Sequence, residues 1–147
     1  MQYKKVCVES FGYELPETIV TSVNLEERLA PIYDKLGLRY GRLEMGTGIR
    51  ERRFWLDGVT PSQAGIKAAE KAIGKSRVNK EDIGCLLHTS VSRDFLEPAT
   101  ATVIHDSLGL SPTATIFDIS NACLGFINGM VTPVSYKHLT LPTTIKP

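Results

Sequence analysis

The amino-acid sequence predicts an α/β fold with a parallel or mostly parallel sheet. Short apolar segments of strand type alternate along the chain with segments of helical period. The 147 residues, 42% hydrophobic and 22% charged, have the composition of an ordinary globular domain. Because 17 basic residues stand against 16 acidic ones, the net charge of +1 does not predict the basic surface of a nucleic-acid-binding protein.

The first third of the chain predicts one strand and a helical stretch. Residues 4–11 predict a strand, with Val6 and Val8 on one face. Asn24, with Glu27 three residues later, indicates a helix start, and the pattern continues toward Gly37. Since Pro31 interrupts this stretch, we expect either a kink or two shorter helices.

The clearest helix signal begins at Thr60. This residue is the predicted N-cap, Pro61 takes the first helical position and Gln63 closes the capping box. Gly74 is predicted to end the helix. One face carries small or branched apolar residues and can pack very close to a sheet or another helix. These residues are Ala64, Ala68, Ala69, Ala72 and Ile73.

The remaining residues predict two strands, at 85–89 and 115–119, and a helix at 98–108 that Gly109 ends. Ala101, Ile104 and Leu108 are expected on its buried face. A further helix is expected to start near Cys123, with its pattern stopping after Met130. We therefore expect a domain over residues 1–131 and, over 132–147, a tail that is disordered or foreign to the domain.

Cys123 lies where a predicted strand turns sharply into a helix. A thiol at a helix N-terminus ionises more readily, and the free N–H groups there can stabilise an oxyanion on an attacked thioester. The alternative, a buried structural thiol, stays open. Cys7 and Cys85 fall within predicted strands and are interpreted as structural. Three widely spaced cysteines and the lack of an apolar signal core predict free thiols in the cytoplasm.

Two further positions are candidates for a site. Glu97 ends a loop that follows a predicted parallel strand, where ligand sites gather in α/β sheets. It is either a carboxylate favoured by the helix dipole or a general base. Arg50 opens a short basic and aromatic run that either binds phosphate or forms a solvated edge. The spacing of the three histidines predicts no metal site.

These segments resemble the ketoacyl synthase III branch of the thiolase superfamily. The stretch 46–52 is similar to that branch's early signature, and 122–126 to its active-site cysteine motif. Residues 27–29, 33–37, 89–94, 96–98 and 126–130 resemble its acyl-CoA condensing, OleA-type members. The resemblance covers about residues 1–130 and implies the N-terminal half of a five-layer αβαβα sandwich, truncated after the cysteine. The family's catalytic His and Asn lie in the second half and are matched neither by His105 nor by His138.

The resemblance implies a Claisen condensation of two fatty acyl-CoA thioesters without decarboxylation, as in olefin biosynthesis. Cys123 would be the nucleophile, and Glu97 the general base serving the partner subunit of a homodimer. Acyl-CoA or acyl-carrier-protein is the expected partner, with no cofactor, metal or membrane span, and the chain alone is expected to be inactive. Two alternatives stay open. One is a decarboxylative 3-oxoacyl-acyl-carrier-protein synthase III, and the other is a non-catalytic α/β interaction protein.

Overall fold

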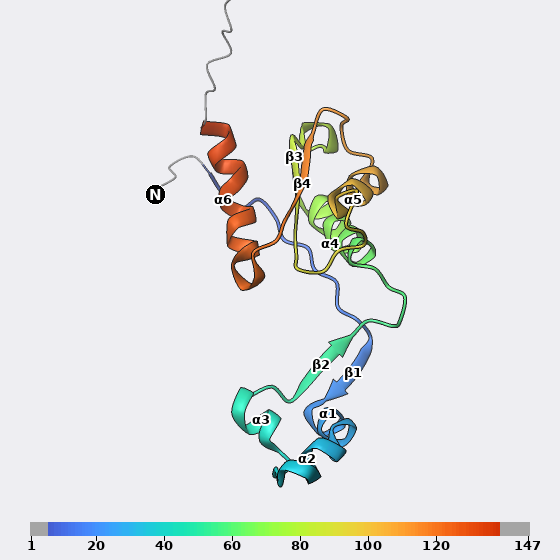
Figure 1. Ribbon diagram of the computed structural model, residues 1–147. Coiled ribbons are helices and arrows are strands. Elements are labelled where there is room, and N and C mark those ends of the chain that lie inside the picture. Colours follow the sequence, from blue (N-terminus) through green and yellow to red (C-terminus); the bar gives the residue numbers. More distant parts are fainter. Residues whose placement is uncertain (1–5, 139–147) are drawn as a thin grey trace, which may run out of the picture. The chain divides into compact units, whose positions relative to one another are not determined.

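The computed structural model describes residues 6–138, which divide into two units (Figure 1). The small unit is Leu15–Val59. The sheet unit joins the residues before Leu15 to those from Thr60 onward.

The small unit pairs two short antiparallel strands that enclose three helices. Strand β1 (Thr18–Thr21) pairs with β2 (Glu51–Phe54), with Thr18 opposite Phe54 and Thr21 opposite Glu51. Between them lie α1 (Ser22–Arg28), α2 (Ala30–Leu36) and α3 (Arg42–Thr47). The antiparallel pair was not predicted from the sequence, because its strands are only four residues long and are separated by 29 residues of helix and turn.

The helical stretch predicted from Asn24 toward Gly37 forms two shorter helices, which was one of the two expected outcomes. The predicted start at Asn24 is wrong by three residues, because Thr21 is the N-cap and Asn24 completes its capping box. Pro31 lies in the first turn of α2, where its missing N–H costs nothing. Gly37 then ends α2 in the left-handed conformation, with φ at 60°.

A buried carboxylate organises the small unit. The side chain of Glu26 is 1% exposed and accepts hydrogen bonds from Gly41 N (2.5 Å), Leu43 N (2.8 Å) and the Tyr33 hydroxyl (3.1 Å). The backbone N–H donors of Leu43 and Gly41 lower the pKa of Glu26. Burial, followed by the bond to Glu26, raises the pKa of Tyr33. Glu26 therefore satisfies the free N–H groups at the start of α3.

The sheet unit is built on a parallel pair of strands. Strand β3 (Cys85–Thr89) pairs in register with β4 (Thr115–Ile119), from Cys85 opposite Thr115 to Thr89 opposite Ile119. Helices α4 (Pro61–Lys75) and α5 (Thr100–Leu108) cover one face, and α6 (Gly125–His138) packs against the other (Figure 1). Two short 3-10 turns, η1 (Lys80–Asp82) and η2 (Ala122–Leu124), complete it. The predicted α/β class and parallel pairing are confirmed.

The core of the sheet unit lies between β3 and the two helices α4 and α5. The predicted face of α5 is buried, with Ala101, Ile104 and Leu108 each at most 4% exposed. Ile104, Leu108 and Leu110 form the centre of this core. Partly buried apolar side chains pack around them, namely Ile66, Ala69, Ile73, Ile83 and Leu86.

The caps of these helices are mostly as predicted. Thr60 and Gln63 form the capping box of α4, and Gly109 ends α5 with φ at 59°. The predicted stop at Gly74 is wrong, because α4 continues through it to Lys75 and Ser76 is the C-cap. A single glycine costs a helix only about 1 kcal/mol, which the packing of α4 outweighs.

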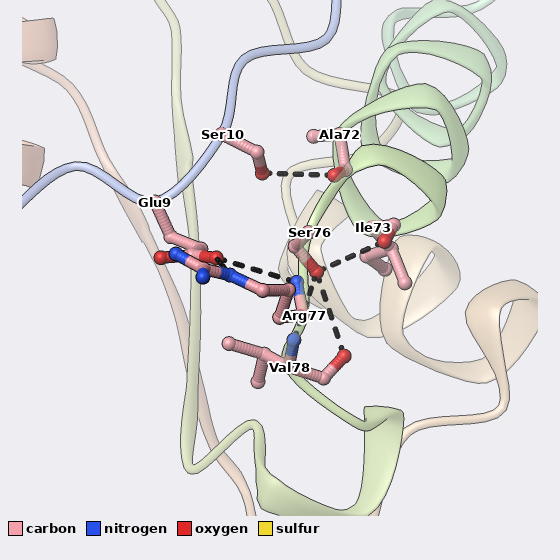
Figure 2. Close-up of polar contacts among 7 residues, drawn as sticks. All are labelled: Glu9, Ser10, Ala72, Ile73, Ser76, Arg77 and Val78. Carbon is pink, nitrogen blue, oxygen red and sulfur yellow. Dashed lines mark hydrogen bonds and ion pairs between the residues drawn. The ribbon is translucent and has the colours of Figure 1, made fainter.

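The N-terminal residues 6–11 do not form the predicted strand. They run along α4 instead, where the Ser10 hydroxyl donates to the Ala72 carbonyl (2.8 Å) and Arg77 Nε lies 3.1 Å from Glu9 Oε1 (Figure 2). At Gly12 the backbone comes so close to α4 that a Cβ would overlap Ala68 O and Ala72 N. The small face of α4 therefore permits a close approach at Gly12, but to an irregular segment of chain and not to the predicted sheet or helix. Residues 4 and 5 of that prediction lie outside the described residues.

Helix α6 is longer than its sequence pattern predicts. The expected stop after Met130 is wrong, because the helix passes through Pro133 and reaches His138. Proline removes one backbone bond there, and nearby hydroxyls bond helix carbonyls, with Thr132 donating to Asn128 O (2.7 Å). The boundary between residues 131 and 132 stays a prediction, and residues 139–147 of the tail lie outside the described ones. Within residues 6–138, no helix is long and apolar enough to cross a membrane.

Candidate functional site

Cys123 is presented at a sharp turn between β4 and α6. Ala122, immediately before it, has φ at 42°, in the left-handed region that costs a non-glycine residue about 1–2 kcal/mol. Cys123 itself lies in η2 and is exposed. The alternative of a buried structural thiol is therefore wrong for this residue. Strain retained next to an exposed thiol is typical of a functional turn.

The turn is held to the helix that follows it. The Asn121 side chain donates to Asn128 Oδ1 (2.7 Å), and Leu124 N donates to Asn121 O (2.9 Å). Gly125 begins α6 and is buried. The thiol thus stands before the N-terminus of a long helix, whose partial positive charge and N–H groups can stabilise a developing oxyanion.

The loop that carries Glu97, residues 90–99, connects β3 to α5 and is hydrogen-bonded to β4 at both of its ends. Ser90 N donates to Ile119 O (3.2 Å), and Thr100 N and Ala101 N donate to the Asp118 carboxylate (2.8 and 2.9 Å). Glu97 is exposed, and within the described residues no hydrogen bond or ion pair engages its carboxylate. The N-terminus of α5 is therefore capped by Asp118, and the carboxylate of Glu97 is free for another role.

Asp94 fixes the middle of the same loop. Its carboxylate accepts bonds from Ser62 N (2.9 Å) and from the Ser62 hydroxyl, at the start of α4. Its own N–H donates to Thr100 Oγ1 (3.1 Å). Ser62 and Thr100 are at most 2% exposed, so these bonds are shielded from water. Neither Asp94 nor Asp118 was predicted as an anchor, because the donors to Asp94 lie 32 residues earlier and those to Asp118 lie 17 and 18 residues earlier.

Glu97 and Cys123 lie at the same edge of the sheet. Both follow the carboxyl ends of β3 and β4, which are parallel neighbours. This is the edge where ligand sites form in α/β sheets. The predicted positions, Glu97 in the loop after β3 and Cys123 in the turn after β4, are confirmed.

An apolar pocket lies between β3 and the first turns of α6. It has a volume of about 200 Å³ and is lined by Leu87, Thr89, Phe126, Gly129 and Met130. Gly129 makes the close packing possible, because a Cβ there would overlap Thr89 Cγ2. An apolar pocket beginning three residues after Cys123 suits a hydrocarbon chain.

Arg50 lies in the small unit, exposed and immediately before β2. Its two basic neighbours have structural partners: Arg52 donates to the Ser22 hydroxyl (3.0 Å) and Arg53 to Pro16 O (3.2 Å). The predicted phosphate contact of Arg50 stays a prediction. In the part of the chain that the structure describes, no three His, Cys, Asp or Glu side chains are grouped to hold a metal.

The other two cysteines differ from Cys123. Cys7 is exposed and lies outside any strand, so its predicted position within a strand is wrong. Cys85 begins β3 and is partly buried, and this burial raises the pKa of its thiol. All three thiols are free.

Comparison with known sequences finds two kinds of relative. An acyl-CoA:acyl-CoA alkyltransferase of Shewanella oneidensis is 44% identical over 131 residues, which are 89% of this chain and 38% of the relative. A β-ketoacyl-[acyl-carrier-protein] synthase III of Bacillus pumilus is 36% identical over 121 residues, 82% of this chain and 36% of the relative. No family model matches the chain.

Solved structures give the same two kinds. Cerulenin-bound OleA of Xanthomonas campestris matches with a TM-score of 0.81 and 41% identity, over 86% of this chain and 37% of that structure. A 3-oxoacyl-(acyl carrier protein) synthase III, FabH, of Xanthomonas oryzae matches with a TM-score of 0.82 and 39% identity, over 87% and 38%. The chain therefore spans less than two fifths of the length of the relatives it matches.

Proposed function

We propose that this chain, which matches part of the condensing enzymes of the ketoacyl synthase III branch in sequence and fold, supplies the acyl-accepting cysteine of an enzyme that joins two fatty acyl-CoA thioesters. The observation that carries the proposal is the exposed thiol of Cys123 on its strained turn before α6. Because the relatives are more than twice as long, the complete reaction is proposed for a protein that joins this chain to the second half implied by the resemblance.

The first step is transfer of an acyl group to Cys123. The thiolate attacks the thioester carbonyl, the carbonyl oxygen becomes an oxyanion, and the bond to the CoA sulfur breaks as that sulfur leaves as a thiolate. The N-terminus of α6 favours the negative charges on the oxyanion and on the departing CoA sulfur. The pocket between β3 and α6 is proposed to take part of the hydrocarbon chain.

The second step requires a base. Glu97 is proposed to remove the α-proton of a second acyl-CoA, and the resulting carbanion attacks the Cys123 thioester to give a β-ketoacyl-CoA and a free cysteine. The exposed, unengaged carboxylate of Glu97 supports this role. In the proposed homodimer this carboxylate serves Cys123 of the partner. The reaction as written needs no cofactor, and its cytoplasmic location and place in olefin biosynthesis belong to the same proposal.

The runner-up is a decarboxylative β-ketoacyl-[acyl-carrier-protein] synthase III. The match to FabH of Xanthomonas oryzae supports it, at a TM-score of 0.82. Two observations favour the acyl-CoA condensing reaction instead. The identity is higher with the alkyltransferase, at 44% against 36%. A carboxylate in the position of Glu97 also has no task where loss of CO₂ generates the carbanion.

The test is a grafted enzyme, in which residues 1–131 of this chain replace the matching residues of OleA from Xanthomonas campestris. Cys123→Ala is expected to abolish acyl transfer to the protein. Glu97→Ala is expected to leave acyl transfer intact and to stop β-keto product formation. Loss of acyl transfer in a folded Glu97→Ala enzyme would contradict the assignment of the base, and release of CO₂ from malonyl-carrier-protein would favour the runner-up.

A further inference from the structure

Asp118 and His88 form a buried pair at the end of the parallel sheet. They stand opposite each other in register, on β4 and β3. Their side chains are 9% and 12% exposed, and His88 Nδ1 lies 3.5 Å from Asp118 Oδ1. Within the described residues this ring nitrogen is buried and has no hydrogen-bond partner. Since a buried polar atom without a partner is costly, the pair calls for an explanation beyond packing.

Asp118 is also the point where the two proposed catalytic segments meet. Its carboxylate oxygens accept the N–H groups of Thr100 and Ala101, three and four residues after Glu97. Asp118 lies on β4, five residues before Cys123, which lies in the turn η2 that follows this strand. The other end of the Glu97 loop is bonded to Ile119, the next residue of β4. The two ends of the Glu97 loop are therefore hydrogen-bonded to two adjacent residues of β4, Asp118 and Ile119.

We propose that Asp118 is a positioning residue for Glu97 and that His88 restrains Asp118; the catalytic meaning of this rests on the function proposed above. With both oxygens engaged by the start of α5, the carboxylate fixes where the Glu97 loop ends relative to the Cys123 turn. His88 closes off the remaining approach to Oδ1, so the carboxylate cannot rotate away from α5. Asp94 and Thr100 carry the restraint back into the loop through their own bond (3.1 Å).

The experiment is amide hydrogen exchange on the full chain, which does not depend on activity. In Asp118→Ala the amides of Thr100 and Ala101 are expected to exchange about tenfold faster or more, because each loses its hydrogen bond to a charged acceptor. Asp118→Asn retains one acceptor oxygen and is expected to restore part of the protection. Asp106→Asn, on the exposed side of the same helix, is the matched control and should change nothing at these amides.

His88 gives a second pair of variants that disturb the core less. His88→Leu removes the ring nitrogen and is expected to speed amide exchange at Thr100 and Ala101. His88→Asn places an amide N–H near the Nδ1 position and should restore the slow exchange of these two amides. Unchanged exchange at Thr100 and Ala101 in Asp118→Ala would overturn the proposal. Equal acceleration of every amide in α4, α5 and both strands, with no rescue by Asn, would also overturn it, because that is a purely structural effect. A grafted enzyme that makes no β-keto product would count against the proposed function and leave this result as it stands.

Discussion

An alanine at Gly129 is predicted to destabilise the sheet unit, whereas an alanine at Gly74 is predicted to stabilise it. Both glycines lie inside helices, at positions where alanine is the better helix former by about 1 kcal/mol. A Cβ at Gly74 meets nothing within 4 Å. A Cβ at Gly129 would overlap Thr89 Cγ2 and lie 3.6 Å from Thr89 Cβ, on the strand that α6 packs against. The two substitutions therefore gain the same helix-propensity free energy and differ in the packing of the added methyl group.

The magnitudes follow from these two terms. Forcing an extra methyl group into a packed interface costs about 1–3 kcal/mol. Subtracting the helix gain of about 1 kcal/mol leaves Gly129→Ala roughly 0–2 kcal/mol less stable than the parent. Gly74→Ala should be about 0.5–1 kcal/mol more stable. The variants are thus expected to differ by about 2 kcal/mol in the free energy of unfolding of the sheet unit.

Urea unfolding followed by far-UV circular dichroism measures this difference, with the midpoint compared at equal slope. Gly129→Ser provides a second test of the contact, because serine adds a similar Cβ together with a hydroxyl. A Gly129→Ala protein at least as stable as Gly74→Ala would refute the reasoning. It would mean that α6 does not approach β3 as closely as the overlap with Thr89 requires.

Two further predictions concern titration. The pKa of Glu26 is lowered in the folded small unit, so its contribution to stability is present above its unfolded pKa of about 4.3 and is lost as the pH falls through its folded pKa. Trp55 is the single tryptophan and lies in the small unit, so its fluorescence should report acid unfolding of that unit. Glu26→Gln should be less stable than the parent at neutral pH and less sensitive to acid. Superimposable curves of fluorescence against pH for the parent and Glu26→Gln would contradict this. Because burial raises the pKa of the Cys85 thiol, mass-spectrometric mapping should find iodoacetamide on Cys123 well before Cys85, with the lag shrinking as the pH rises; equal rates for the two thiols at mildly alkaline pH would count against the described burial.

Local signals in the sequence were enough for the start of α4 and the end of α5. The capping box of Thr60 and Gln63, and the stop at Gly109, depend only on residues within one turn, so short-range chemistry decides them. The cysteine turn was also found, because a strand, a sharp turn and a helix follow one another directly at Cys123.

What the sequence did not reveal depends on contacts between distant residues. Val6 and Val8 alternate as in a strand, but Ser10 bonds to α4 62 positions away and Gly12 lies against the same helix. No pattern within the segment shows these contacts. Glu26 reads as a surface residue of a helix, yet it is buried because the N–H groups of Gly41 and Leu43 converge on it. Asp118 was missed as an anchor for the same reason, since its donors lie 17 and 18 residues earlier.

The central claim is that Cys123 accepts an acyl group. The most direct measurement is mass-spectrometric mapping of the grafted enzyme after brief mixing with a saturated long-chain acyl-CoA and acid quenching. We predict one acyl group in thioester linkage on the peptide that contains Cys123, and its complete absence from the folded Cys123→Ala enzyme. An acyl group on another residue, or an acylated Cys123→Ala protein, would contradict the account.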